Sequence, residues 1–145
     1  MILTASKIYI DTAPFIYYLE KNTHYYNAVR EFFAACYHQH IPLVTSAVTL
    51  EEYCVFPFSN NDTAAVLAFD QFLRGMQIDV VNVDKTVALR AAEVRSEYKY
   101  FKALDAIHLA TAMLTECDVF LTNDNQLRQA KNIRVVTADN IADLF

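Results

Sequence analysis

Glycine is almost absent from this chain: Gly75 is the only one among 145 residues. Loops that cradle phosphates need glycines where the backbone takes a positive φ or lies close to a phosphate. With a single glycine there is no Walker A loop, no GxGxxG dinucleotide fingerprint and no GxSxG nucleophile elbow. Nucleoside-triphosphate hydrolysis, Rossmann-type hydride transfer and serine-hydrolase chemistry are therefore poor explanations of this sequence.

An excess of basic residues is also missing. The chain has 17 Asp and Glu against 12 Lys and Arg, for a formal net charge of −5. This balance argues against a sequence-independent polyanion binder, because affinity for phosphates comes from clustered Lys and Arg. It does not exclude a protein whose acids are concentrated in a cation-binding pocket.

Paired cysteines and long hydrophobic runs are lacking as well. Cys36, Cys54 and Cys117 are odd in number, far apart and without a Cys-x-x-Cys pair, which predicts reduced thiols in a cytoplasmic protein. Lys7 and Asp11 interrupt the N-terminal segment, so we expect no signal peptide. No run approaches the roughly 18 apolar residues of a membrane span, and we expect no membrane partner.

The composition is that of a folded domain, with 54% hydrophobic and 20% charged residues. The length predicts one domain over residues 1–145. Short β-branched runs predict strands at 7–10, 42–46, 78–83, 119–122 and 133–136. Helical patterns predict helices at about 15–19, 25–37, 48–53, 63–73, 84–98, 105–112 and 126–131, with a loop at 56–61. Strands separated by helical crossovers favour an α/β fold with three layers, a central parallel sheet of about five strands flanked by helices.

Three acids lie where predicted strands lead into helices, and a fourth opens a helix. Asp11 and Asp124 directly follow the first and fourth strands, Glu52 lies early in the helix after the second strand, and Asp105 opens an otherwise uncharged helix. In open parallel sheets, ligands bind outside the carboxyl ends of the strands, at such junctions. These four acids are therefore the candidate site.

Each acid has a structural alternative. Asp11, Asp105 and Asp124 are plausible helix N-caps, and Thr49 with Glu52 fits a capping box. Four acids at one sheet edge would, however, repel one another unless a cation lay between them. Oxygen ligands suit Mg²⁺ or Mn²⁺, ions that commonly serve phosphoryl chemistry.

Four stretches carry a family resemblance: IDT at 10–12, SAVTLEE at 46–52, LDAIHLATA at 104–112 and LTND at 121–124. With these motifs the chain resembles PIN-domain ribonucleases, and within them the VapC toxins of VapBC toxin–antitoxin pairs. The resemblance implies a PIN-like fold and an Mg²⁺- or Mn²⁺-dependent endoribonuclease that hydrolyses RNA phosphodiester bonds with metal-activated water. Toxins of this family are often homodimers bound by an antitoxin that blocks the site, so a homodimer and an antitoxin become candidate partners.

The resemblance also assigns residues. It implies that Asp11, Glu52, Asp105 and Asp124 are the catalytic, metal-binding acids, with Asp11 and Asp105 as the best direct ligands. Glu52 and Asp124 would act through water, through a second ion or by orienting the nucleophile. Two polar residues, Thr12 and Asn123, match positions that help hold the site together. Many relatives have asparagine where this chain has Ala13, a difference that is expected to weaken a supporting hydrogen bond.

Substrate binding has two explanations. Arg95, Lys99 and Lys102 would share one helical face leading to Asp105 if that helix continued, and a basic strip there would attract an RNA backbone. The alternative is a solvated face whose bases pair with neighbouring glutamates.

Two further points stay open at this level. His108 could contact substrate, although a packed core histidine is the expectation. The competing function is an inactive PIN-like binding module in which all four acids are helix caps, which predicts no bound metal.

Overall fold

The sheet defines the fold. A computed structural model describes residues 2–145, in which the strands pair in parallel in the order β3-β2-β1-β4-β5. The strands are β1 (Ile8–Ile10), β2 (Leu43–Ser46), β3 (Asp79–Val81), β4 (Val119–Thr122) and β5 (Arg134–Thr137). All five lie at or within two residues of the ranges that the sequence predicts, which confirms the parallel α/β architecture.

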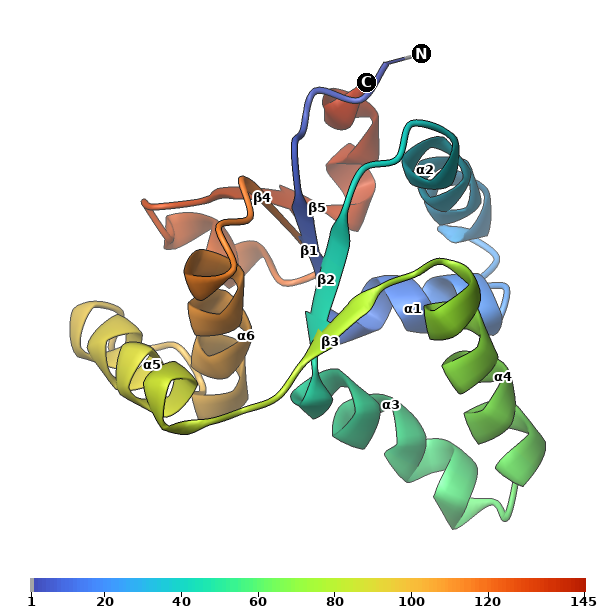
Figure 1. Ribbon diagram of the computed structural model, residues 1–145, viewed down its shortest axis with the longest axis horizontal. Coiled ribbons are helices and arrows are strands. Elements are labelled where there is room, and N and C mark those ends of the chain that lie inside the picture. The colour runs from blue at the N-terminus through green and yellow to red at the C-terminus, as the bar shows by residue number, and fades with distance from the viewer. Residues whose placement is uncertain (1) are drawn as a thin grey trace.

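Helices cover both faces of this sheet (Figure 1). They are α1 (Thr12–Leu19), α2 (Tyr26–His38), α3 (Ala47–Ser59), α4 (Thr63–Gly75), α5 (Lys85–Glu97) and α6 (Ala103–Leu114), with 3₁₀ helices η1 (Asn125–Gln129) and η2 (Ala138–Leu144). In Figure 1, α5 and α6 lie on one side of the sheet, and α1, α2 and α4 on the other. No helix within residues 2–145 is long and apolar enough to cross a lipid bilayer.

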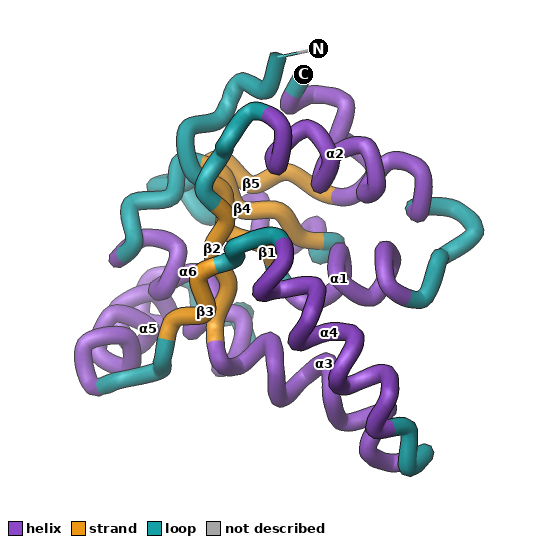
Figure 2. The backbone as a smooth tube through the Cα atoms, turned by 45° about the vertical axis from the view of Figure 1, so that its right-hand side comes forward, coloured by secondary structure: helices purple, strands orange, loops and turns teal. Residues whose placement is uncertain are grey.

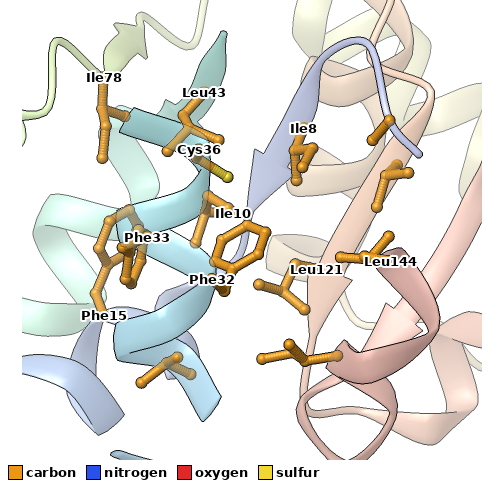
Figure 3. Packing of buried hydrophobic residues seen from close by; sticks show 14 of the residues in the cluster. Ile8, Ile10, Phe15, Phe32, Phe33, Cys36, Leu43, Ile78, Leu121 and Leu144 are labelled. Carbon is orange, nitrogen blue, oxygen red and sulfur yellow. The ribbon is translucent and has the colours of Figure 1, made fainter. Parts of the chain in front are cut away.

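The alternation of side chains along β1 divides the core into two halves. Ile8 and Ile10 pack with Phe15 and Phe32 on the α1 and α2 side, as Figure 3 shows. Tyr9, between them, points to the opposite face and packs against α5 and α6. All three strand residues are completely buried, because both faces of a parallel sheet are covered.

The loop predicted at 56–61 is wrong, because α3 continues through Pro57 to Ser59. A proline inside a helix removes one backbone hydrogen bond, which makes a loop the reasonable expectation. Here Pro57 is buried and Tyr53, one turn before it, stacks on Phe69 of α4 with ring centroids 4.1 Å apart. This packing holds α3 and α4 together as the pair seen in Figure 2.

The helix predicted at 84–98 ends at Glu97, and Tyr98 takes non-helical backbone angles. Lys99 and Lys102 therefore lie in the connection to α6, and the predicted single helical face with Arg95 is wrong. Helix η2, near the C-terminus, was not predicted from the sequence, although its buried residues Ala138, Ile141 and Leu144 recur every three residues.

The strand order reverses at β1. From β1 the chain builds the sheet outward through β2 and β3, and then returns to place β4 and β5 on the other side of β1. Ligands bind at such a reversal point, outside the carboxyl ends of the adjacent strands. Asp11 directly follows β1 and Asp124 lies two residues after β4, so both lie at this reversal point.

Candidate metal site

Asp11 is held from two sides. Its Oδ1 accepts a hydrogen bond from the backbone N–H of Thr12 at 2.8 Å, and its Oδ2 accepts one from Oγ1 of Thr122 at 2.7 Å. The first bond makes Asp11 the N-cap of α1, as the cap hypothesis predicts. The second bond comes from the neighbouring strand β4 and has no capping role, so it fixes the carboxylate at the reversal point.

Glu52 is not part of a capping box. The N-cap of α3 is Ser46, and Thr49 pairs with Thr45 instead. Oε1 of Glu52 accepts two hydrogen bonds, from Oγ1 of Thr12 at 2.8 Å and from Nε2 of His108 at 2.6 Å. No hydrogen bond within residues 2–145 reaches Oε2, and the side chain is 32% exposed. The second oxygen is therefore available to a ligand.

His108 joins the two acids. Its Nε2 lies 2.6 Å from Oε1 of Glu52 and 3.4 Å from Oδ1 of Asp11, while its side chain is only 1% exposed. Burial alone would lower the pKa of His108, but the hydrogen bond to Glu52 and the nearby carboxylates raise it above its ordinary value. The same hydrogen bond is the main reason that the pKa of Glu52 is lowered.

Sequence reasoning assigned His108 to the packed core, which is right about burial but misses its contacts with the acids. A signal was present in the spacing. His108 lies three residues after Asp105, and residues three apart share one face of a helix. If Asp105 points to the carboxyl edge of the sheet, His108 lies on the same side of α6.

Asp105 is not the N-cap of α6, because the helix begins two residues earlier, after Lys102; as the third helical residue it still faces the backbone of that N-cap, as in a capping box. Burial raises the pKa of Asp105, and the negative charges of Asp11 and Asp124 raise it further. These influences indicate that the three carboxylates lie close enough to repel one another.

Asp124 is a helix cap and is also linked to the carboxylate of Asp11. Its side chain caps η1 by accepting a hydrogen bond from the backbone N–H of Gln126 at 2.9 Å. Its own backbone N–H donates to Oγ1 of Thr122 at 3.1 Å, and that hydroxyl donates onward to Asp11. Thr122 therefore couples the backbone position of Asp124 to the carboxylate of Asp11.

The other predicted residues differ in how they relate to these acids. Thr12 donates a hydrogen bond to Glu52, whereas the exposed side chain of Asn123 makes no hydrogen bond to the four acids in the described part of the chain. Arg95, Lys99 and Lys102 are exposed, and no ion pair within residues 2–145 engages them.

The residues present fit a divalent cation. Asp11 and Glu52 each have a carboxylate oxygen within 4.8 Å of the other and of a ring nitrogen of His108, whereas Asp105 and Asp124 are not part of this group. The negative charges of Asp11 and Asp124 raise the pKa of Asp105, and the charge of His108 offsets this rise only in part. Hard cations prefer carboxylate oxygens, and a cation here would relieve the repulsion among the acids.

Comparisons with known proteins agree with this fold. The PIN domain family model matches residues 8–140, and the chain belongs to that family. No curated protein matches the chain. Among solved structures, the chain is similar to DNA-bound VapBC from Salmonella typhimurium, at 20% identity and a TM-score of 0.73 over 95% of this chain and 99% of that one.

Two further structures show the same fold. A toxin–antitoxin complex from Klebsiella pneumoniae matches at 21% identity and a TM-score of 0.67, covering 91% of this chain and 98% of that chain. Mycobacterium tuberculosis VapC20, described as a sarcin–ricin loop cleaving toxin, matches at 16% identity and a TM-score of 0.64, covering 79% and 87%. At these identities the likeness establishes the architecture, and chemistry must be argued from the site.

Proposed function

We propose that this protein is an Mg²⁺- or Mn²⁺-dependent endoribonuclease that hydrolyses RNA phosphodiester bonds. One observation carries the proposal. Asp11 and Glu52, which lie far apart in the sequence, have carboxylate oxygens within 4.8 Å of each other, and Glu52 has no capping role that would explain its position. Membership in the PIN family supports nuclease chemistry, and the RNA-cleaving description of a structural neighbour supports RNA as the substrate.

The four acids have different roles in this proposal. Asp11 and Asp105 are the direct ligands of the cation, while Glu52 and Asp124 hold or orient water beside it. When bound, the cation supplies charge neutralisation at the scissile phosphate and a more acidic water. Thr12 and Thr122 restrain the carboxylates of Glu52 and Asp11, so that they need not reorganise when substrate arrives.

The competing function, an inactive binding module with four capping acids, is only half supported by the contacts. Asp11 and Asp124 do cap helices. Glu52 instead binds Thr12 and His108, and Asp105 lies inside the first turn of a helix that begins without it. A capping role also gives no reason for Asp105 to lie where the charges of Asp11 and Asp124 raise its pKa.

RNA must approach a protein of net charge −5. The exposed Arg95, Lys99 and Lys102 lie at the end of α5 and in the connection that leads to α6 and Asp105. In the proposal these three basic side chains attract the phosphate backbone of RNA from the end of α5 and the connection that follows it, and not from a single helical face.

An apolar groove between α3 and α4 supports a protein partner. It has a volume of about 770 Å³, and Leu50, Cys54, Phe58 and Leu67 are among its lining residues. Phe58 and Leu67 are each 59% exposed, which is costly for a protein that stays alone in water. In the proposal an antitoxin or a second subunit covers this groove. The molar mass from light scattering tests this, measured on the protein purified alone and on the protein co-expressed with the product of the adjacent gene.

The decisive test of the enzyme is cleavage of end-labelled RNA in Mg²⁺, Mn²⁺ or EDTA. Asp11→Asn keeps the helix cap, because asparagine caps as well as aspartate. Asp84→Asn is a matched control, since Asp84 caps α5 away from the acids. We expect metal-dependent cleavage by the wild type and the control, and none by Asp11→Asn. Equal cleavage by all three would exclude the proposed site.

A further inference from the structure

A buried chain of polar side chains runs from the sheet to Glu52. The hydroxyl of Tyr9 lies 2.6 Å from Nδ1 of His108, and Nε2 of the same ring lies 2.6 Å from Oε1 of Glu52. Tyr9 is completely buried and His108 is 1% exposed. The site-supporting residues assigned from sequence, Thr12 and Asn123, do not include this pair.

Packing fixes both rings in place. Tyr9 stacks on Phe120 with centroids 5.1 Å apart and an angle of 3° between the planes, and it meets the edge of His108 at 5.7 Å and 68°. The imidazole therefore cannot rotate without disturbing the central strands. A rigid donor beside a carboxylate can determine where that carboxylate points.

The direction of the hydrogen bonds follows from the partners. Nε2 of His108 faces two carboxylates, Glu52 and Asp11, and an ionised carboxylate only accepts hydrogen bonds. Nε2 must therefore carry a proton and donate it. In the neutral ring Nδ1 is then an acceptor and the hydroxyl of Tyr9 donates to it, whereas in the charged ring both nitrogens donate and the hydroxyl accepts.

We infer that Tyr9 and His108 are positioning residues, which lock Oε1 of Glu52 in place and so aim Oε2 at the cation site. Thr12 donates to the same Oε1, so both donors restrain this oxygen and leave Oε2 without a hydrogen bond from them. His108 acts through Glu52 and is not itself a ligand. The metal-binding consequence rests on the proposed function, whereas the hydrogen-bond direction does not.

A merely structural histidine is a poor explanation of this arrangement. A buried polar side chain must find hydrogen-bond partners to offset its desolvation, and an apolar residue would fill the same space without that need. Every buried side-chain nitrogen and oxygen within residues 2–145 has a partner. For His108 those partners are Tyr9 on β1 and Glu52, so we attribute the presence of a polar residue here to its hydrogen bond with the glutamate.

The tautomer can be observed directly by nitrogen-15 NMR of the histidine rings in the metal-free protein. We expect a protonated Nε2 in the wild type, and in Tyr9→Phe a shifted Nδ1 signal, because its hydroxyl partner is gone. Addition of Mg²⁺, which is diamagnetic, should leave the proton on Nε2. A bare Nε2 in the metal-free protein, or loss of its proton on adding Mg²⁺, would overturn the inference, the second result by making His108 a ligand.

Calorimetric titration with Mn²⁺ tests the consequence. His108→Leu removes the donor and should weaken Mn²⁺ binding by about 10–100-fold, the usual cost of losing an outer-shell partner. His108→Gln should retain most of the affinity, because its amide can donate from nearly the position of Nε2. Unchanged affinity in a folded His108→Leu protein, or an equal loss in both variants, would contradict positioning by a donated hydrogen bond.

Thr111→Val is the matched control. Thr111 is buried one turn further along α6. Its hydroxyl donates to the backbone carbonyl of Ile107 at 2.7 Å, and its backbone carbonyl accepts from the hydroxyl of Thr115. It should bind Mn²⁺ as the wild type does. If the wild type bound no Mn²⁺, the proposed function would fail, and the NMR measurement would still decide the direction of the Tyr9–His108–Glu52 bonds.

Discussion

Replacing Asp105 by asparagine should stabilise the metal-free protein and remove most of its stabilisation by Mn²⁺. The pKa of Asp105 is raised by burial and by the charges of Asp11 and Asp124, so its ionised form lowers the stability of the fold at neutral pH. Asparagine removes the charge and keeps the shape. No cap is lost, because Asp105 is not the N-cap of α6.

The size of the metal effect can be estimated. A cation at about 100 times its Kd stabilises the folded state by about 2.7 kcal/mol. For a chain of 145 residues this corresponds to a rise in Tm of about 5–11 °C, taking about 2–4 °C per kcal/mol. If the substitution weakens binding about 100-fold, the same concentration stabilises by only about 0.4 kcal/mol, or about 1–2 °C.

Thermal melts of the wild type, Asp105→Asn and Asp84→Asn in EDTA and in Mn²⁺ measure both effects. We expect Asp105→Asn to melt above the wild type in EDTA and to gain little from Mn²⁺, while Asp84→Asn gains as much as the wild type. A variant that melts lower in EDTA and keeps the full Mn²⁺ shift would refute the reasoning, since Asp105 would then be a structural acid.

Three further predictions follow from the same contacts. Folding lowers the pKa of Glu52, so the stability that this carboxylate contributes is lost as the pH falls below about 4.5. Folding raises the pKa of His108, so the stability that this histidine contributes is lost as the pH rises above about 6.5. Thermal melts in EDTA should therefore show the greatest stability between these two pH values, and a maximum outside this window would contradict the pairing. Burial raises the pKa of Cys36 to about 12, so a thiol reagent at pH 8 should modify it only as the protein unfolds, and mass spectrometry showing rapid modification would oppose this. Phe32→Ala should cost about 3–5 kcal/mol in denaturant unfolding, whereas Phe56→Ala, at a residue 68% exposed, should cost less than about 0.5 kcal/mol, and similar losses would contradict the core assignment.

The sequence was sufficient for the sheet, because each strand is a short apolar run and the helices between the strands require parallel pairing. It also placed Asp11 and Asp124 correctly beside β1 and β4, since these acids directly follow the strands. Their assignment as caps is confirmed too, because a side chain at a helix start contacts only its own neighbours in sequence.

Contacts between distant segments could not be predicted in the same way. Glu52 binds Thr12, 40 residues away, and His108, 56 residues away, so its local capping pattern with Thr49 was misleading. The helix through Pro57 was missed because its stabilising partner, Phe69, lies on α4. In both cases tertiary packing overrides a local preference, and only the folded chain shows the partner.

The central claim is that acids at this edge of the sheet hold a divalent cation, and a crystal structure grown in Mn²⁺ tests it most directly. Anomalous scattering at the manganese edge locates the ion independently of any assumption about its ligands. We predict a peak within ligand distance of carboxylate oxygens of Asp11 and Asp105, with Oε2 of Glu52 directed towards it. A structure with these carboxylates ordered and no peak between them would contradict the claim, and the acids would then be structural.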